Sequence, residues 1–229
     1  MLYNDFPKMA VQTPNGNEVV ITMIHHGSVA VSYNGYEIQV DPVADMDGHT
    51  ADFASFPKAD LILVSHEHGD HLDKKAVQTL SKEGTTIICN QGSKASLASA
   101  RVFANGDSAV INNDITVCAV PAYNNSEGHT KFHPQGHGNG YVLVIDGLKI
   151  YVAGDTEDIP EMSALKGIDV AFLPVNQPYT MTVPQCIKAA RMFKPAVLVP
   201  YHFSNTDLGS LPSELKADGI EVRIFDNLK

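Results

Sequence analysis

Short apolar runs separated by turn residues recur along this chain, and they fall into two batches. The first batch of strand-like runs covers residues 19–23, 29–33, 36–41, 61–65, 86–90, 109–111 and 115–120, and the second covers 141–145, 149–153, 170–174, 197–200 and 222–225. Asn34-Gly35 and Asp146-Gly147 each separate two runs by two residues, which is the strongest short-range signal for a β-hairpin. The pattern therefore predicts many short strands, some of them joined as hairpins.

Helical spacing predicts four helices, at residues 74–82, 93–100, 184–193 and 210–217. Asp73 suits the N-cap of the first helix. The third begins at Thr182 or Val183, and Pro184 suits its first turn.

Hairpins first, with helices between the later strands, predict an α/β fold: an αββα sandwich of two mixed β-sheets with helices on the outer faces. No Pro/Gly/Ser-rich linker divides the chain, so we expect a single domain over residues 1–229. We expect its two halves to meet near residues 121–140.

Composition limits the partners and the compartment. The 229 residues can bury a full core, and the formal net charge is −10. Without a Lys/Arg cluster, this charge disfavours nucleic acid as a partner. Three widely spaced cysteines fit buried, reduced thiols, so we expect a cytoplasmic protein unless a leader precedes this sequence. No apolar run reaches membrane-spanning length, and the oligomeric state is not readable.

The loop H-E-H-G-D-H at residues 66–71 brings four strong metal ligands together directly after an apolar strand. In extended backbone His66, His68 and Asp70 share a face, while His71 points the other way. Two neighbouring cations divide such ligands more easily than one cation accepts all four. A structural zinc site would be closed by four ligands, usually with thiolates, and no cysteine is near. The loop therefore predicts an open, catalytic metal site.

Two further ligand candidates follow later strands. Asp155 lies in Gly154-Asp155-Thr156 after the run 149–153, and His202 follows the run 197–200. Strand ends in such sheets collect at one crevice, so we expect both residues beside the loop 66–71. The long polar segment 123–140 adds three more histidines, and loops of this length are usually functional or mobile.

These motifs together resemble the metallo-β-lactamase superfamily of metal-dependent hydrolases. The match consists of His66-x-His68-x-Asp70-His71, a histidine before a strand, Gly154-Asp155-Thr156 and His202, in the family's order from about residue 24 to residue 203. The chain is also similar to the branch that includes sugar-phosphate lactonase-like and phospholipase-D-like hydrolases. That likeness is carried by Asp41-Pro42, Phe132-His133-Pro134 and Pro200-Tyr201-His202.

The resemblance implies two metal sites. The first would use His66, His68 and the histidine before the strand, and the second would use Asp70, His71 and His202, with Asp155 bridging both metals. His133 fits the His-Pro pattern of the branch and is the predicted third ligand of the first site. His137 and His129 are the alternatives.

The implied cofactors are two divalent cations, with Zn²⁺ as the first choice because histidine dominates, and Mn²⁺ or Fe²⁺ as compatible alternatives. The expected reaction is hydrolysis of an ester-type bond, in a lactone or a phosphodiester-like small molecule, by a hydroxide that bridges the cations. Asp70 is the expected catalytic residue, which accepts a proton during attack or returns one to the leaving group.

Several residues are candidates for supporting roles. Asp41 could accept the free N–H of a ligand histidine and fix its tautomer. His26 could line the pocket rim, although one of the adjacent pair His25 and His26 must face away. Polar groups near strand ends could bind a substrate or simply pack, namely Tyr123, Asn124, Asn176, Tyr179 and Tyr201.

Three alternatives remain. Diiron redox chemistry of the same superfamily expects a carboxylate where this chain has His68, together with a fused flavin module. An RNA-processing nuclease would need a basic surface or an inserted nucleic-acid domain. A metal-binding regulatory or ligand-binding module without turnover would not need a complete set of ligands around an open site.

Overall fold

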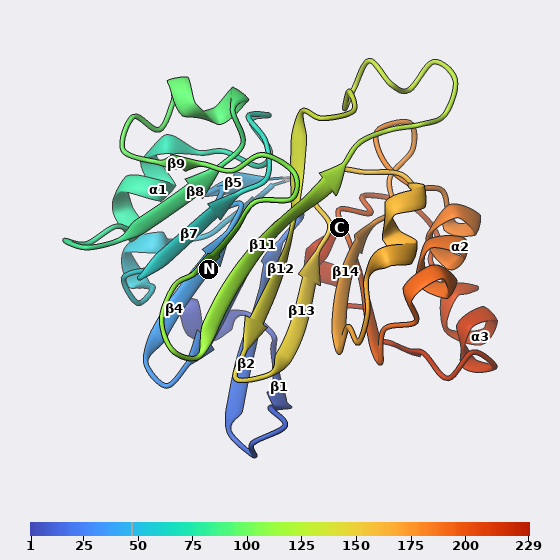
Figure 1. The fold of residues 1–229 in the computed structure, drawn as a ribbon, viewed down its shortest axis with the longest axis horizontal. Coiled ribbons are helices and arrows are strands. Elements are labelled where there is room, and N and C mark those ends of the chain that lie inside the picture. Colours follow the sequence, from blue (N-terminus) through green and yellow to red (C-terminus); the bar gives the residue numbers. More distant parts are fainter. Residues whose placement is uncertain (47) are drawn as a thin grey trace.

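Two seven-stranded β-sheets form the middle of the molecule in the computed structural model, which describes residues 1–46 and 48–229 (Figure 1). In spatial order, the first sheet contains β1 (Lys8–Gln12), β2 (Glu18–His25), β3 (Ser28–Tyr33), β4 (Tyr36–Val40), β7 (Leu61–Val64), β8 (Thr86–Cys89) and β9 (Arg101–Val102). The second contains β10 (Ser108–Val110), β11 (Ile115–Ala122), β12 (Gly138–Ile145), β13 (Leu148–Val152), β14 (Val170–Pro174), β15 (Val197–Tyr201) and β16 (Glu221–Val222). A small ribbon pairs β5 (Asp45–Met46) with β6 (His49–Thr50).

Each sheet begins as an antiparallel meander and continues with parallel strands. In the first sheet β1 to β4 are antiparallel, and β4, β7, β8 and β9 are parallel. In the second, β10 to β13 are antiparallel and β13 to β16 are parallel. The carboxyl ends of parallel strands meet at one edge of a sheet. The loops after β4, β7, β13 and β15 therefore supply residues to a common region.

Helices cover the outer faces, as the sequence predicts. Helix α1 (Lys74–Leu80) lies on one side, and α2 (Val183–Phe193) and α3 (Leu211–Lys216) lie on the opposite side, with the sheets between them (Figure 1). The Asp73 carboxylate caps α1, and Thr182 forms a capping box with Gln185 at the start of α2. The 3-10 helices are Tyr3–Asp5, Phe53–Ser55, Gly92–Ala95, Pro160–Ala164 and Asp226–Leu228.

Strand β7 shows why the run before the metal-ligand loop is uninterrupted and apolar. Leu61 and Leu63 pack into the core between the sheets, whereas Ile62 and Val64 pack into the layer beneath α1. A strand buried on both faces needs apolar residues at every position. The hairpin turns Asn34-Gly35 and Asp146-Gly147 also agree with the prediction, because all four residues have positive φ.

The predicted helix over 93–100 is wrong. Only Gly92–Ala95 forms a turn of 3-10 helix, and the chain then turns into β9, which begins at Arg101. The Lys94 ammonium donates to the carbonyls of Ala98 and Ala100, which holds this connection in a compact turn.

The expected meeting point of the two halves is also wrong. Strands β10 and β11 belong to the second sheet, so the chain crosses between sheets after β9 and well before residue 121. Strand β11 pairs with β12 along its whole length, so it belongs to the second sheet although it follows strands of the first sheet in sequence. The predicted strand 222–225 shortens to Glu221–Val222, and β1, with only Met9 buried, was not predicted.

The three cysteines are free thiols, and Cys89 and Cys186 are buried. Among the described residues, none of the helices has the length and apolar character required to cross a membrane.

Candidate metal centre

Three histidines from two distant segments meet beyond the end of β7. One nitrogen from each of His66, His68 and His133 lies within 4.8 Å of the others. His66 and His133 are buried, whereas His68 is exposed. Of the three histidines in the long segment before β12, the structure therefore brings His133 to this group.

The other two histidines of that segment lie elsewhere. The Nδ1 atom of His129 is 3.1 Å from Glu157 Oε1, and His137 Nε2 pairs with the Glu67 carboxylate. Neither belongs to the clusters of ligand atoms found among the described residues.

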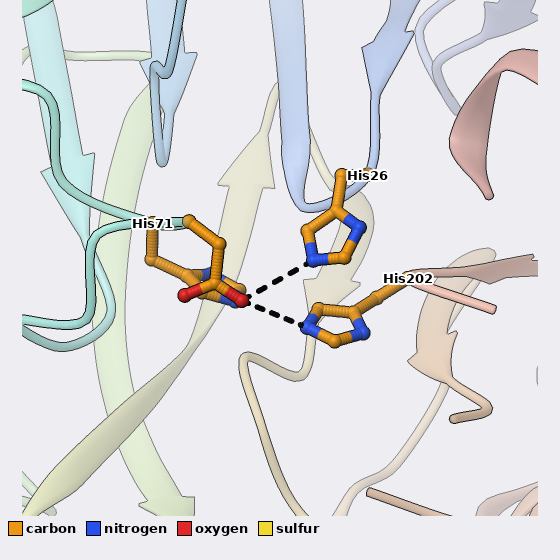
Figure 2. Close-up of side chains that lie close together, drawn as sticks. His26, His71 and His202 are labelled. Atoms are coloured by element: carbon orange, nitrogen blue, oxygen red, sulfur yellow. Dashed lines mark hydrogen bonds and ion pairs between the residues drawn. The ribbon is translucent and has the colours of Figure 1, made fainter. Parts of the chain in front are cut away.

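A second group gathers beside the first. Ligand atoms of His26, Asp70, His71 and His202 all lie within 4.8 Å of one another. Figure 2 shows His26 and His202 side by side, each joined by a dashed line to one carboxylate oxygen, with His71 next to them. That oxygen is Asp70 Oδ2, which lies 3.3 Å from His26 Nε2 and 3.4 Å from His202 Nε2.

Asp155 contacts both groups. Its Oδ2 lies 3.1 Å from His133 Nε2 and 3.4 Å from His202 Nε2, and its Oδ1 lies 3.2 Å from His71 Nε2. Gly154 makes this approach possible, because its φ is +65° and a Cβ there would stand 2.7 Å from the Asn139 carbonyl. The carboxylate thus stands between the two clusters.

Several polar atoms of this centre are buried without a hydrogen-bond partner among the described residues. They are Nε2 of His66, His71, His133 and His202, and Oδ1 of Asp155. Buried polar atoms are normally paired, because leaving one unpaired is costly. Imidazole nitrogens and a carboxylate oxygen that converge in this way fit the donor preferences of a divalent cation.

Other contacts hold the histidine rings from behind. Asp41 Oδ2 accepts from His71 Nδ1 at 2.8 Å and from Ser65 Oγ at 2.6 Å, and Asp41 Oδ1 accepts from the Ser65 N–H at 2.7 Å. Ser65 Oγ also lies 2.9 Å from His66 Nδ1. Pairing of Nδ1 leaves Nε2 of each ring free to act as a ligand. Ser65 was not predicted to belong to this centre, although its place at a strand end was a usable signal.

Asn124 and Tyr201 are not where a substrate would reach. Asn124 is 1% exposed and its Oδ1 lies 3.2 Å from His133 Nδ1, so it holds that ring from behind. Tyr201 is fully buried, and burial raises the pKa of its hydroxyl well above the ordinary value. Tyr123 is also buried, with its hydroxyl donating to Glu161.

The carboxylates of the centre determine which histidines carry charge. Burial and the neighbouring His71 keep the pKa of His66 well below its ordinary value. Burial acts the same way on His71, but Asp155 and Asp41 outweigh it and raise the pKa of His71 well above normal. Asp155 likewise outweighs burial at His202 and raises its pKa to about 9. In the metal-free protein, protonated His71 and His202 therefore place positive charge at the centre where a metal cation would bind.

A cavity of about 330 Å³ opens over these ligands. Besides His26, His68, Asp70, His133, Asp155 and His202, its lining residues are Met46, Phe132, Asn176, Tyr179 and Ser204. Phe132 and Tyr179 meet edge to face with ring centroids 5.0 Å apart. Among the residues that the structure describes, no Lys or Arg lines this cavity.

Fold and site together define a class of protein, the metal-dependent hydrolases built on the metallo-β-lactamase fold. Residues 20–202 match the family model described as the Beta-lactamase superfamily domain, and the chain belongs to this superfamily as a metal-dependent hydrolase. The narrower likeness to the lactonase-like branch stays a prediction.

Individual relatives agree with this assignment. The UPF0173 metal-dependent hydrolase of Thermococcus kodakarensis is 32% identical over 202 residues, which cover 82% of this chain and 88% of the relative. A solved structure from Parabacteroides distasonis, of a protein assigned as a metal-dependent hydrolase, is 52% identical, with a TM-score of 0.92, and the match covers 96% of this chain and 98% of that one. A metallo hydrolase from Ignicoccus hospitalis, 23% identical over 92% of this chain and 96% of that one, shares the fold with a TM-score of 0.77.

Proposed function

We propose that this enzyme hydrolyses an ester-type bond in a small molecule, with a lactone or another uncharged ester as the substrate class, and with two divalent cations as cofactors. His66, His68 and His133 would hold the first cation, and Asp70, His71 and His202 the second. Asp155 would contact both.

One observation carries the proposal: buried, unpaired ligand atoms from the ends of both sheets converge around a carboxylate that touches both groups. When bound, a pair of cations lowers the pKa of a water between them and polarises a substrate oxygen. Zn²⁺ fits the histidine-rich donors best, and Mn²⁺ and Fe²⁺ accept the same donor types.

The cavity lining supports the substrate class. Phosphate groups are usually bound by Arg or Lys, and the described lining offers neither. Phe132, Tyr179 and Met46 instead offer apolar and aromatic surface, with polar groups from Asn176 and Ser204. Such a lining suits a neutral ester with an apolar portion better than a phosphodiester.

Asp70 is the proposed proton acceptor. Its side chain is 31% exposed, which makes it more accessible than the buried Asp155. Burial opposes ionisation of Asp70, but the His202 and His26 rings, whose Nε2 atoms face Asp70 Oδ2, outweigh it and keep the pKa of Asp70 well below the ordinary value. It is therefore ionised in the metal-free protein, which is the form that both a cation ligand and a proton acceptor must have.

The test is a panel of lactones, carboxylic esters, thioesters and phosphodiesters, assayed with metal-loaded and chelator-treated protein. We expect metal-dependent turnover of lactones or carboxylic esters, and Asp70→Ala should lower kcat by at least about 100-fold, the smaller effect typical of losing a general acid or base. Asp114→Ala, in an exposed turn, is the matched control. Preference for phosphodiesters would refute the substrate class. Ligand binding without turnover would identify a binding module.

A further inference from the structure

His26 stands among the ligand atoms of the second group, although the superfamily resemblance gives it no role there. It follows β2 directly, and its neighbour His25 points away, with Nε2 2.7 Å from the Val43 carbonyl. The backbone of His26 has a φ of +49°, an uncommon conformation for a residue other than glycine. This turn directs the His26 side chain toward the centre and leaves it only 3% exposed.

The contacts of His26 match those of His202. Both Nε2 atoms face Asp70 Oδ2, at 3.3 Å and 3.4 Å, and the two rings lie against each other with centroids 3.7 Å apart (Figure 2). The backbone N–H of His202 also donates a hydrogen bond to the backbone carbonyl of His26, at 3.2 Å. Gly27 permits the approach of this turn to the centre, because a Cβ there would stand 2.7 Å from the His71 ring.

We propose that His26 is an additional protein ligand of the second cation; this inference rests on the dinuclear centre of the proposed function. The second site then has donors from His26, Asp70, His71 and His202 as well as Asp155. The first site has three histidines, one of them exposed, in addition to Asp155.

The two sites therefore differ in role. A site enclosed by protein ligands holds its metal, whereas a site with fewer ligands keeps a position for water or substrate. By donor number, the second cation is the more tightly held one, whereas the first site keeps a position for water or substrate; residues of both sites line the cavity. The larger donor number of the second site would also favour a metal that accepts high coordination numbers, such as Mn²⁺ or Fe²⁺.

The test removes the ligand while preserving the backbone. His26→Asn is the variant of choice, because Asn tolerates positive φ and its shorter side chain does not reach the cation. His26→Gly accepts the same backbone and serves as the second variant. His49→Gln, at an exposed histidine on β6, is the matched control.

Protein loaded with Zn²⁺ or Mn²⁺ is dialysed against graded chelator, and the bound metal per chain is measured. We expect wild type and His49→Gln to retain two cations under conditions in which both His26 variants retain one, with the affinity of the weakened site lowered by at least about 10-fold. With Co²⁺, the visible absorption of one site should change in the His26 variants, since its coordination number falls.

Two failures are distinguishable. If wild type binds two cations and the His26 variants bind both with unchanged affinity and unchanged Co²⁺ absorption, His26 is only a hydrogen-bond donor to Asp70 and the inference is wrong. If wild type itself never binds two cations, the dinuclear function fails as well. Contact shifts in Co²⁺-loaded wild type provide a measurement that needs no variant, because they pass through metal–ligand bonds: six histidine rings are expected to show them across the two sites if His26 is a ligand, and five if it is not.

Discussion

Two aspartates stand at opposite ends of the β12–β13 hairpin, and their surroundings differ completely. Asp146, in the hairpin turn, accepts hydrogen bonds from Thr13 Oγ1 at 2.6 Å, Asn15 Nδ2 at 2.6 Å and Asn17 Nδ2 at 2.8 Å. These neutral donors from the β1–β2 turn tie the two sheets together. Asp155, just beyond β13, is 4% exposed, faces histidines from both clusters, and has an oxygen without a partner among the described residues.

The comparison shows how a structural carboxylate differs from a functional one. The carboxylate oxygens of Asp146 accept hydrogen bonds from uncharged hydroxyl and amide groups. One carboxylate oxygen of Asp155 has no hydrogen-bond partner among the described residues, and the carboxylate faces histidine rings that can release a proton and bind a metal instead. Unpaired ligand atoms, rather than the presence of an aspartate, therefore mark the site.

The largest effect is expected from Asp155→Asn. This change removes the negative charge that both groups of ligands share. It should therefore lower metal affinity and kcat/KM by more than about 100-fold, since about 100-fold is the largest effect typical of losing a residue that only hydrogen-bonds to a metal ligand. Metal content per chain and hydrolysis rates measure the effect. Retention of two cations at wild-type affinity would contradict the bridging role.

Asp41→Asn should have the next largest effect. Asp41 touches no proposed cation, but it orients His71 and Ser65, so we expect metal affinity to fall by about 10- to 100-fold. Competition with a coloured chelator measures this affinity. An affinity equal to that of wild type would mean that the His71 ring needs no partner on its far side.

A pH titration of the metal-free protein sharpens the same contrast. Asp155 and Asp70 raise the pKa of His202 to about 9, so its contribution to stability is complete below about pH 6.5, the ordinary value for histidine. That contribution is lost as the pH rises toward 9. Thermal unfolding of the metal-free protein should therefore show lower stability at pH 9.5 than at pH 6.5. Asp155→Asn should flatten this dependence of stability on pH. An equally steep dependence in the variant would contradict the assignment of the raised His202 pKa to Asp155.

Asp146→Asn should have the smallest effect. Its partners are neutral and partly exposed, so we expect a small fall in melting temperature and an unchanged kcat/KM. The pKa of Asp146 lies below its ordinary value because of Thr13, Asn17 and Asn15, so this small contribution disappears as the pH falls through that lowered value. A loss of activity as large as that of Asp155→Asn would remove the distinction between the two ends of the hairpin.

Local signals in the sequence determined much of the fold. Leu61–Val64, Asn34-Gly35 and Asp73 each favour one local structure through burial, turn geometry or capping, and the structure has those elements where they were predicted. The sequence also pointed to His66–His71, Asp155 and His202 as ligand candidates, because these residue types follow strands whose ends meet. The long-range placement of β10 and β11 was not predictable in this way, since strand pairing depends on contacts between distant residues.

Only the tertiary structure decided which distant groups share a site. It brought His133 rather than His129 or His137 beside His66 and His68, and it turned His26 toward Asp70. Each of these outcomes depends on backbone geometry and on partners tens of residues away, which a linear pattern does not contain. The sequence determined which types of ligand are present, whereas the packing of the two sheets determined which of these ligands lie together.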